Sequence, residues 1–125
     1  MYEVIVEGEF SAAHFLKLTD GSWEPRHGHD WRVAVTVRSG ELDSMGVVVD
    51  FEELKPRLRK VLKDFSEISI NDHPEFKNEK LNPSTENIAR LIYERLLRDI
   101  KPKGARIVKV TVWETPDASA SYYVE

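Results

Sequence analysis

Residues 27–37 read His27-Gly28-His29-Asp30-Trp31-Arg32-Val33-Ala34-Val35-Thr36-Val37. From Trp31 to Val37 every second residue is apolar, which is the period of a β-strand with one buried face. His27 and His29 share the parity of that apolar row, so we expect both imidazoles on the same face of the strand. Two imidazoles on one face provide half of a tetrahedral metal site.

A third histidine, His14, follows another alternating run. Residues 2 to about 10 alternate as a strand, and His14 has the parity of its apolar side chains, Val4, Val6 and Phe10. Three neutral imidazoles with an open fourth position are typical of catalytic zinc, whereas structural zinc is usually closed by four ligands, mostly cysteine. The chain has no cysteine. The pattern therefore favours a catalytic Zn²⁺ on His14, His27 and His29, and the alternative for each histidine alone is an ordinary polar role.

The periods of apolar residues along the chain predict four strands and two helices. In chain order these are a strand from 2 to about 10, a strand over 31–38, a helix carrying Leu54, Leu58, Val61, Leu62 and Phe65, a helix begun by 83–86 and carrying Ile88, Leu91, Ile92, Leu96 and Ile100, and strands over 106–114 and 119–125. This order predicts an α+β fold, with a four-stranded antiparallel sheet and both helices on one face. Pro56 lacks an amide N–H, so we expect the first helix to start late or to kink.

Length and charge exclude several classes of protein. The 125 residues fit a single domain, 1–125, and the balance of 22 acidic against 18 basic residues gives a net charge of -4. With the charges interspersed, nucleic acid is not an expected partner. No segment has the apolar length of a membrane span, and the N-terminus lacks the basic and apolar regions of a signal peptide. We therefore expect a cytoplasmic protein without a membrane partner.

Three acidic or polar motifs are candidates for the chemistry. Glu114 continues the parity of an apolar row, Val108, Val110 and Val112. It either lies in water at the sheet edge or is satisfied by a ligand, because a carboxylate can accept two parallel N–H bonds from a pterin or guanine ring. Asp72-His73 and Glu24 have simpler alternatives, a turn and a solvated loop.

Six segments, in this order, resemble the 6-pyruvoyl-tetrahydropterin synthase family, which also contains the 6-carboxytetrahydropterin synthases. They are Phe10-Ser11-Ala12-Ala13-His14, His27-Gly28-His29, Gly46-Val47-Val48-Val49-Asp50-Phe51, Asp72-His73, Pro83-Ser84-Thr85-Glu86-Asn87-Ile88-Ala89 and Val112-Trp113-Glu114-Thr115. The match spans essentially the whole chain. It implies a tunnelling fold, in which trimers close a barrel from their sheets and two trimers stack into a homohexamer with active sites between subunits.

The resemblance also implies roles for individual residues and a substrate. The implied groups are the zinc ligands His14, His27 and His29, the pterin-binding residues Glu114, Thr85 and Glu86, and a proton relay, Asp72-His73. The implied substrate is a small molecule, 7,8-dihydroneopterin triphosphate, and the implied activity is that of a carbon–carbon or carbon–oxygen lyase.

One departure from the family pattern concerns the base. The pyruvoyl and carboxy synthases carry a cysteine shortly before H-G-H, whereas this chain has Glu24-Pro25-Arg26-His27-Gly28-His29. This segment resembles the E-x-x-H-G-H subgroup, in which glutamate replaces the cysteine and the product is 6-hydroxymethyl-7,8-dihydropterin, a precursor for folate biosynthesis. Glu24 is accordingly the expected base of a retro-aldol cleavage.

Three alternatives stay open at this point. The first is a pyruvoyl- or carboxy-forming synthase that uses Glu24 in place of the cysteine. The second is a pterin- or purine-binding module without catalysis. The third is a structural metal that holds subunits together, which predicts that chelation dissociates or unfolds the oligomer.

Overall fold

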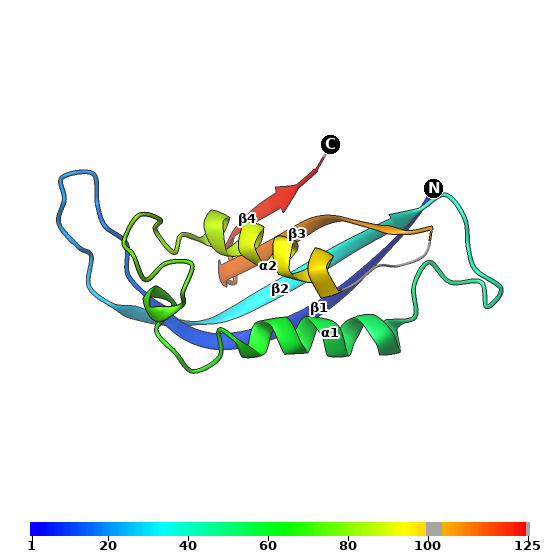
Figure 1. Ribbon diagram of the computed structural model, residues 1–125, viewed down its shortest axis with the longest axis horizontal. Coiled ribbons are helices and arrows are strands. Elements are labelled where there is room, and N and C mark those ends of the chain that lie inside the picture. Colours follow the sequence, from blue (N-terminus) through cyan, green and yellow to red (C-terminus); the bar gives the residue numbers. More distant parts are fainter. Residues whose placement is uncertain (100–103, 125) are drawn as a thin grey trace.

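The computed structural model describes residues 1–99 and 104–124. Figure 1 shows a β-sheet with helices packed along it. The elements are β1 (Tyr2–His14), β2 (His27–Ser39), α1 (Phe51–Lys63), a 3₁₀ turn (Ile70–Asp72), α2 (Thr85–Asp99), β3 (Arg106–Thr115) and β4 (Ala118–Tyr123). The four strands form one antiparallel sheet in the order β1-β2-β3-β4. This confirms the predicted α+β architecture, with both helices inserted between the second and third strands.

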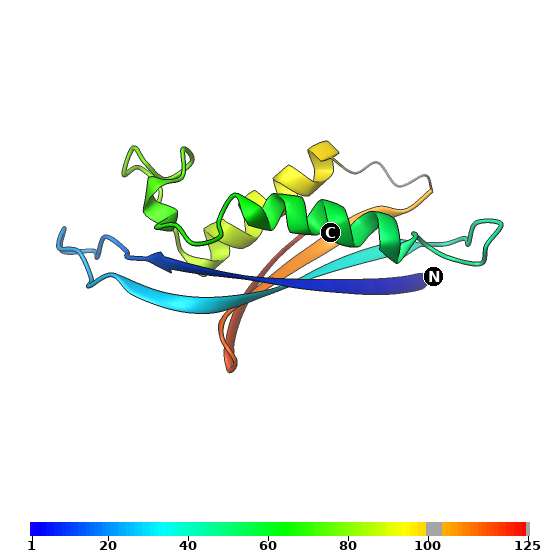
Figure 2. The same ribbon diagram turned by 90° about the horizontal axis from the view of Figure 1, so that it is seen from below.

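Both helices cover the same face of the sheet, and no helix or strand of the described residues lies on the opposite face, as Figure 2 shows. The apolar row of β2 is fully buried under the helices, with Trp31, Val33, Val35 and Val37 all at 0% exposure. The helix α1 crosses β1 at Gly8, where a Cβ atom would lie 2.9 Å from Leu62 Cδ1. The absence of a side chain at Gly8 therefore allows close contact between helix and sheet.

The two N-terminal strands are longer than the sequence predicted. β1 continues past residue 10 to His14 and β2 begins at His27, four residues before the expected start. The two strands stay paired over this extension, from Phe10 opposite Trp31 to His14 opposite His27. The strands are longer because the two extensions pair with each other, so that the backbone N–H and C=O groups of each form hydrogen bonds with the other.

The helix α1 begins at Phe51, so the predicted late start was wrong. Asp50 caps it, accepting a hydrogen bond from the backbone N–H of Glu52, and Pro56 lies inside the helix. Proline at this position removes the intrahelical donor for the Glu52 carbonyl. Glu52 and Pro56 are both exposed, so water can replace the missing donor to the Glu52 carbonyl and the helix loses little stability.

The parity predicted for the third strand fails at one position. A register shift between Thr36 and Val37 of β2 places Ile107, rather than Val108, opposite Val37. Ile107 therefore joins Val110 in the main core, while Val108 is buried outside that cluster. A β-bulge adds one residue to a strand and reverses the faces on one side of it.

The C-terminal elements follow the prediction with small changes at their ends. Ser84 caps α2 by accepting a hydrogen bond from the Asn87 backbone N–H. The predicted stripe residue Ile100 lies outside the described residues, as does residue 125 of the predicted fourth strand. Within 1–99 and 104–124, no helix has the length and apolarity needed to cross a membrane.

Candidate metal centre and active site

The pairing of β1 with β2 brings the three predicted histidines together. His14 is the last residue of β1 and lies opposite His27, while His29 lies opposite Ala12. Directly paired residues of an antiparallel sheet have Cβ atoms about 5 Å apart, and residues two apart on one strand share a face. The ring centroid of His27 is accordingly 4.5 Å from that of His14 and 4.9 Å from that of His29.

The core beneath the cluster fixes these rings. His14 is 1% exposed, and its ring meets the ring of Trp31 edge-on at a centroid distance of 4.8 Å. Trp31 is itself held by a hydrogen bond from its indole N–H to the carbonyl oxygen of Ala12. His27 and His29 are more open, at 37% and 22% exposure, so the cluster is rigid on its inner side and accessible from outside.

Backbone carbonyls orient two of the imidazoles. His14 Nδ1 lies 2.8 Å from the carbonyl oxygen of Pro83, and His27 Nδ1 lies 2.9 Å from that of Pro25. A carbonyl oxygen only accepts hydrogen bonds, so each Nδ1 carries a proton and, in the neutral ring, each Nε2 presents a lone pair. Metal-binding histidines are held in this way by an outer hydrogen bond.

The chemistry of this donor set fits a metal ion. His14 Nε2 and His29 Nε2 are buried and have no hydrogen-bond partner. Burial lowers the pKa of His29, an effect that the Glu114 carboxylate opposes and that His27 and His14 reinforce. The neutral form that burial favours at His29 is the form that binds metal. Three nitrogens of this kind match the zinc preference for imidazole ligands.

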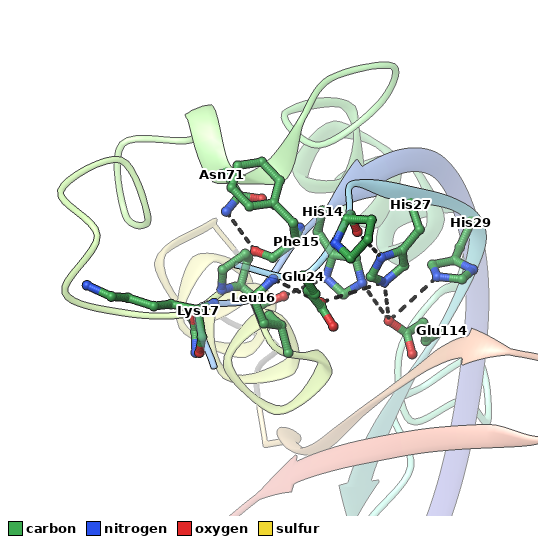
Figure 3. Close-up of polar contacts among 12 residues, drawn as sticks. His14, Phe15, Leu16, Lys17, Glu24, His27, His29, Asn71 and Glu114 are labelled. Atoms are coloured by element: carbon green, nitrogen blue, oxygen red, sulfur yellow. Dashed lines mark hydrogen bonds and ion pairs between the residues drawn. The ribbon is translucent and has the colours of Figure 1, made fainter. Parts of the chain in front are cut away.

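Glu114 lies inside the same cluster. Its Oε1 atom is 2.6 Å from His14 Nε2, 3.8 Å from His27 Nε2 and 3.7 Å from His29 Nε2, as drawn in Figure 3. The ligand atoms of these four residues all lie within 4.8 Å of one another. The predicted parity of Glu114 thus carries it to the histidines rather than beyond the sheet edge.

Glu24 lies beside the cluster and also stabilises its own loop. One carboxylate oxygen, Oε1, is 3.9 Å from His27 Nε2 and accepts a hydrogen bond of 2.9 Å from the backbone N–H of Leu16. The backbone N–H of Glu24 donates to the carbonyl oxygen of Leu16. Figure 3 shows this carboxylate between Leu16 and the imidazoles. Glu24 is therefore near the candidate metal site and also part of a structural contact.

Asp72 and His73 have different surroundings. Asp72 is exposed, whereas His73 is 7% exposed and its ring stacks on Phe65 at a centroid distance of 5.0 Å. His73 Nδ1 accepts a hydrogen bond from the backbone N–H of Glu75. No contact within residues 1–99 and 104–124 links Asp72 or His73 to the histidine cluster, so their predicted relay is not assembled in a single chain.

Thr85 and Glu86 lie in the first turn of α2. Thr85 is half-buried and Glu86 is exposed. They follow Pro83, whose carbonyl oxygen bonds to His14, so this turn is anchored next to the cluster. In the part of the chain that the structure describes, no contact joins either of them to Glu114, and their role in pterin binding stays a prediction.

Sequence reasoning missed the groups that orient the site. The carbonyls of Pro25 and Pro83 carry no side-chain signal, although both prolines stand close to motif residues. Trp31 was recognised as a buried strand residue, but its contact with the His14 ring depends on the pairing of two strands.

The arrangement of the sheet and helices defines the class of fold. A solved structure of 6-pyruvoyl tetrahydropterin synthase from Caenorhabditis elegans matches with a TM-score of 0.79 and 27% identity, over 100% of this chain and 98% of that one. The Plasmodium falciparum 6-pyruvoyl tetrahydropterin synthase structure gives 0.79 at 25% identity, over 98% of each chain. The fold is therefore the tunnelling fold predicted from the sequence motifs.

The family follows from two further comparisons. The family model for 6-pyruvoyl tetrahydropterin synthase matches residues 3–125, and the chain belongs to this family. Dihydroneopterin monophosphate aldolase from Pyrococcus furiosus is 34% identical over 111 residues, 89% of this chain and 88% of that protein. The 6-carboxy-5,6,7,8-tetrahydropterin synthase of Bacillus subtilis is 32% identical over 126 residues, 97% of this chain and 84% of that protein.

Proposed function

We propose that this protein is a zinc-dependent lyase that cleaves the side chain of 7,8-dihydroneopterin triphosphate and releases 6-hydroxymethyl-7,8-dihydropterin, a folate-type precursor. The observation that carries the proposal is the convergence of three imidazole Nε2 atoms with a carboxylate, Glu24, 3.9 Å from one of them. Membership of a pterin synthase family supplies the substrate class.

The proposed reaction is a retro-aldol cleavage. The bond between the first two side-chain carbons breaks, the hydroxyl of the second carbon loses its proton, and that carbon leaves as a phosphorylated two-carbon aldehyde. The first carbon receives the electron pair, which the conjugated ring stabilises, and then takes up one proton. One proton is removed and one is added, so no oxidant or reductant is required. Zinc bound at this site supplies Lewis acidity for a substrate hydroxyl.

Glu24 is the group proposed to move the proton. Its carboxylate is partly buried, at 27% exposure, and close to His27. A glutamate carboxylate beside a metal can accept a proton from a substrate hydroxyl that the metal has acidified. The same carboxylate can return the proton to the first side-chain carbon.

The names of two relatives bear on the product. The P. furiosus relative is an aldolase by name, which is the reaction class proposed here, and its name specifies a monophosphate. The B. subtilis relative is a 6-carboxytetrahydropterin synthase, which favours the rival product. The absence of any cysteine, the base expected in the pyruvoyl and carboxy synthases, supports the aldolase proposal.

The remaining predicted residues fit an oligomeric site. Glu114, Thr85 and Glu86 are proposed to bind the pterin ring, and Asp72-His73 to serve a site on a neighbouring subunit. This assignment would explain why the pair makes no contact with the cluster of its own chain. We also propose that the protein forms a hexamer of two stacked trimers and works in the cytoplasm.

Product analysis tests the reaction. The zinc-loaded protein is incubated with 7,8-dihydroneopterin triphosphate and, separately, with the monophosphate, and the pterins are identified by mass spectrometry. We expect 6-hydroxymethyl-7,8-dihydropterin and one equivalent of the two-carbon aldehyde. A pyruvoyl or carboxy pterin would overturn the aldolase proposal. Turnover of the monophosphate alone would correct the substrate to the ester named for the P. furiosus relative.

Glu24→Gln separates the base from the structural contact, because an amide oxygen still accepts the hydrogen bond of Leu16 but is not basic. We expect turnover to fall about 10²- to 10⁴-fold, with zinc content and melting temperature unchanged. Glu24→Ala, which removes both roles, is the comparison. If the parent shows no turnover while both variants keep zinc and pterin affinity, the binding-module alternative is preferred.

A further inference from the structure

Glu114 reaches the histidines from a third strand of the sheet. The register between β3 and β4 shifts between Trp113 and Thr115, so Glu114 lies at an irregularity rather than in the regular ladder. Its side chain is 29% exposed, and the same oxygen, Oε1, faces all three Nε2 atoms. Figure 3 shows the carboxylate and the imidazoles pointing toward one centre.

This contact is unfavourable unless a cation lies within it. His14 and His27 donate their Nδ1 protons to carbonyl oxygens, so their Nε2 atoms present lone pairs. When the His14 ring is neutral, a carboxylate oxygen 2.6 Å from its Nε2 places two electron-rich atoms against each other. A proton on His14 Nε2 would pair that nitrogen with Glu114, but it would leave the buried His29 Nε2, 3.7 Å from the same oxygen, without a partner. Buried polar atoms of this kind are costly when nothing pairs with them.

The spacing is close to that of a four-ligand zinc site. Zinc bonds of 2.0–2.1 Å in a tetrahedron separate neighbouring ligand atoms by about 3.3 Å. The distances from Glu114 Oε1 to the Nε2 atoms of His27 and His29 are 3.8 and 3.7 Å, and the distance to His14 is shorter, at 2.6 Å. A movement of the carboxylate away from His14 and toward His27 and His29 would bring all three distances closer to the tetrahedral value.

We propose that Glu114 is the fourth protein ligand of the metal in the substrate-free protein, and that it leaves the metal when a pterin binds. The Glu114 carboxylate would then exchange the metal for the pterin ring. It would leave the metal and accept hydrogen bonds from the ring N–H groups. The metal ligation rests on the geometry alone, whereas the exchange also rests on the proposed function.

This exchange would make the site selective. A ligand that offers the metal an oxygen but has no N–H pair for Glu114 leaves the displaced carboxylate without a partner, which costs free energy. A ligand with both an oxygen and an N–H pair replaces Glu114 on the metal and also gives the displaced carboxylate a hydrogen-bonding partner. The closed resting site would also exclude simple anions from the metal.

A crystal structure of the zinc-loaded, pterin-free protein tests the ligation directly. Anomalous diffraction locates the ion, and we expect a Glu114 carboxylate oxygen at about 2.0–2.2 Å from it. A solvent atom in that place, with the carboxylate more than about 3 Å away, overturns the proposal. No substrate and no turnover enter this measurement, so failure of the aldolase proposal leaves its result unaffected.

Cobalt substitution gives a solution test with a matched control. The visible spectrum of the Co²⁺ protein is titrated with thiocyanate, for the parent, for Glu114→Ala, and for Glu9→Gln, which removes one negative charge from the exposed side of β1. We expect Glu114→Ala to bind thiocyanate at least 10-fold more tightly than the parent and Glu9→Gln do. Equal binding by all three overturns a closed site.

The exchange itself is tested with pterin lacking a side chain, added to the Co²⁺ protein. This probe has the ring N–H groups but no hydroxyls for the metal. We expect it to change the cobalt spectrum of the parent and to allow thiocyanate to bind, because it withdraws Glu114. A parent spectrum that stays constant at saturating pterin, with binding shown by pterin fluorescence, overturns the exchange and leaves ligation to be judged from the crystal.

Discussion

Two proline carbonyls decide how the imidazoles are used. Pro83 and Pro25 accept the Nδ1 protons of His14 and His27, so both rings present Nε2 to the centre of the cluster. Both prolines lie next to regular structure, since Pro83 directly precedes Ser84, the cap of α2, and Pro25 lies two residues before the start of β2. The orientation of the candidate metal ligands therefore depends on backbone positions that no single side chain reveals.

His73 illustrates a second kind of constraint at the scale of one residue. Burial lowers its pKa, the positive charge of Arg95 adds to this, and Asp64 and Glu75 oppose it. The folded protein thus holds His73 neutral at pH values where the unfolded chain, with a pKa near 6.5, already binds a proton.

The sign of the pH dependence follows from proton linkage. Stability rises with pH wherever the unfolded state binds more protons, so the contribution of His73 is complete above about pH 6.5 and is lost as pH falls toward its folded pKa. We predict that the stability advantage of the parent over His73→Gln shrinks between about pH 7.5 and pH 5. Denaturant unfolding of the metal-free proteins measures it. An advantage that is constant with pH would contradict the prediction.

At the scale of elements, two asparagines extend the end of β1. Asn71 accepts the backbone N–H of Phe15 and donates to its carbonyl oxygen, at 3.0 and 2.8 Å. Asn82 makes the same pair of bonds to Lys17, at 2.8 and 2.9 Å. Each side-chain amide makes the pair of backbone hydrogen bonds that a neighbouring strand would make. The segment that follows His14 is thereby held against residues 71–82.

Removing one of these amides should be costly, because two backbone groups of Phe15 lose their partners. We predict that Asn71→Ala lowers the free energy of unfolding by about 1–3 kcal/mol. Asn78→Ala is the matched control, since the Asn78 side chain accepts a local, exposed hydrogen bond from the backbone N–H of Lys80. Chemical denaturation measures both variants. Equal losses would show that the double bonds of Asn71 contribute nothing specific.

At the scale of the whole molecule, the sheet leaves most of its two edges open. The strand order makes β1 and β4 the outer strands. Within residues 1–99 and 104–124, no strand pairs with the outer side of β4, and the outer side of β1 is bonded near its end, where Ala13 bridges Ser69. The face opposite the helices is bare of secondary structure in Figure 2. Open edges and an uncovered face are features that proteins usually cover by association or closure. The proposed trimer would join the edges of neighbouring sheets into a barrel.

We predict a native mass of six chains by light scattering, unchanged when a chelator removes the metal. Chelation should leave the assembly intact because His14, His27, His29 and Glu114 all belong to one chain. Dissociation on chelation would favour the structural-metal alternative instead. A mass of one chain at micromolar concentration would contradict the proposed assembly.

Strand and helix periods alone determined the architecture, because burial of one face imposes a pattern that is local in sequence. The parity of His27 and His29 with Trp31 needed no tertiary information, and neither did the apolar stripes of the helices. The prediction failed at Ile107 and Val108 because a bulge is set by pairing with a neighbouring strand, not by the period of the strand itself.

The candidate site, like the fold, was predicted in part from the sequence and in part decided by the tertiary structure. The sequence identified His14, His27, His29 and Glu114, since each shares the parity of a buried row. Only the tertiary structure decided that Glu114 faces the three Nε2 atoms, that two carbonyls fix the tautomers, and that His73 is buried away from the cluster. The physical reason is that residue type and parity are local properties, whereas the distance between strand ends depends on the register of pairing across the whole sheet.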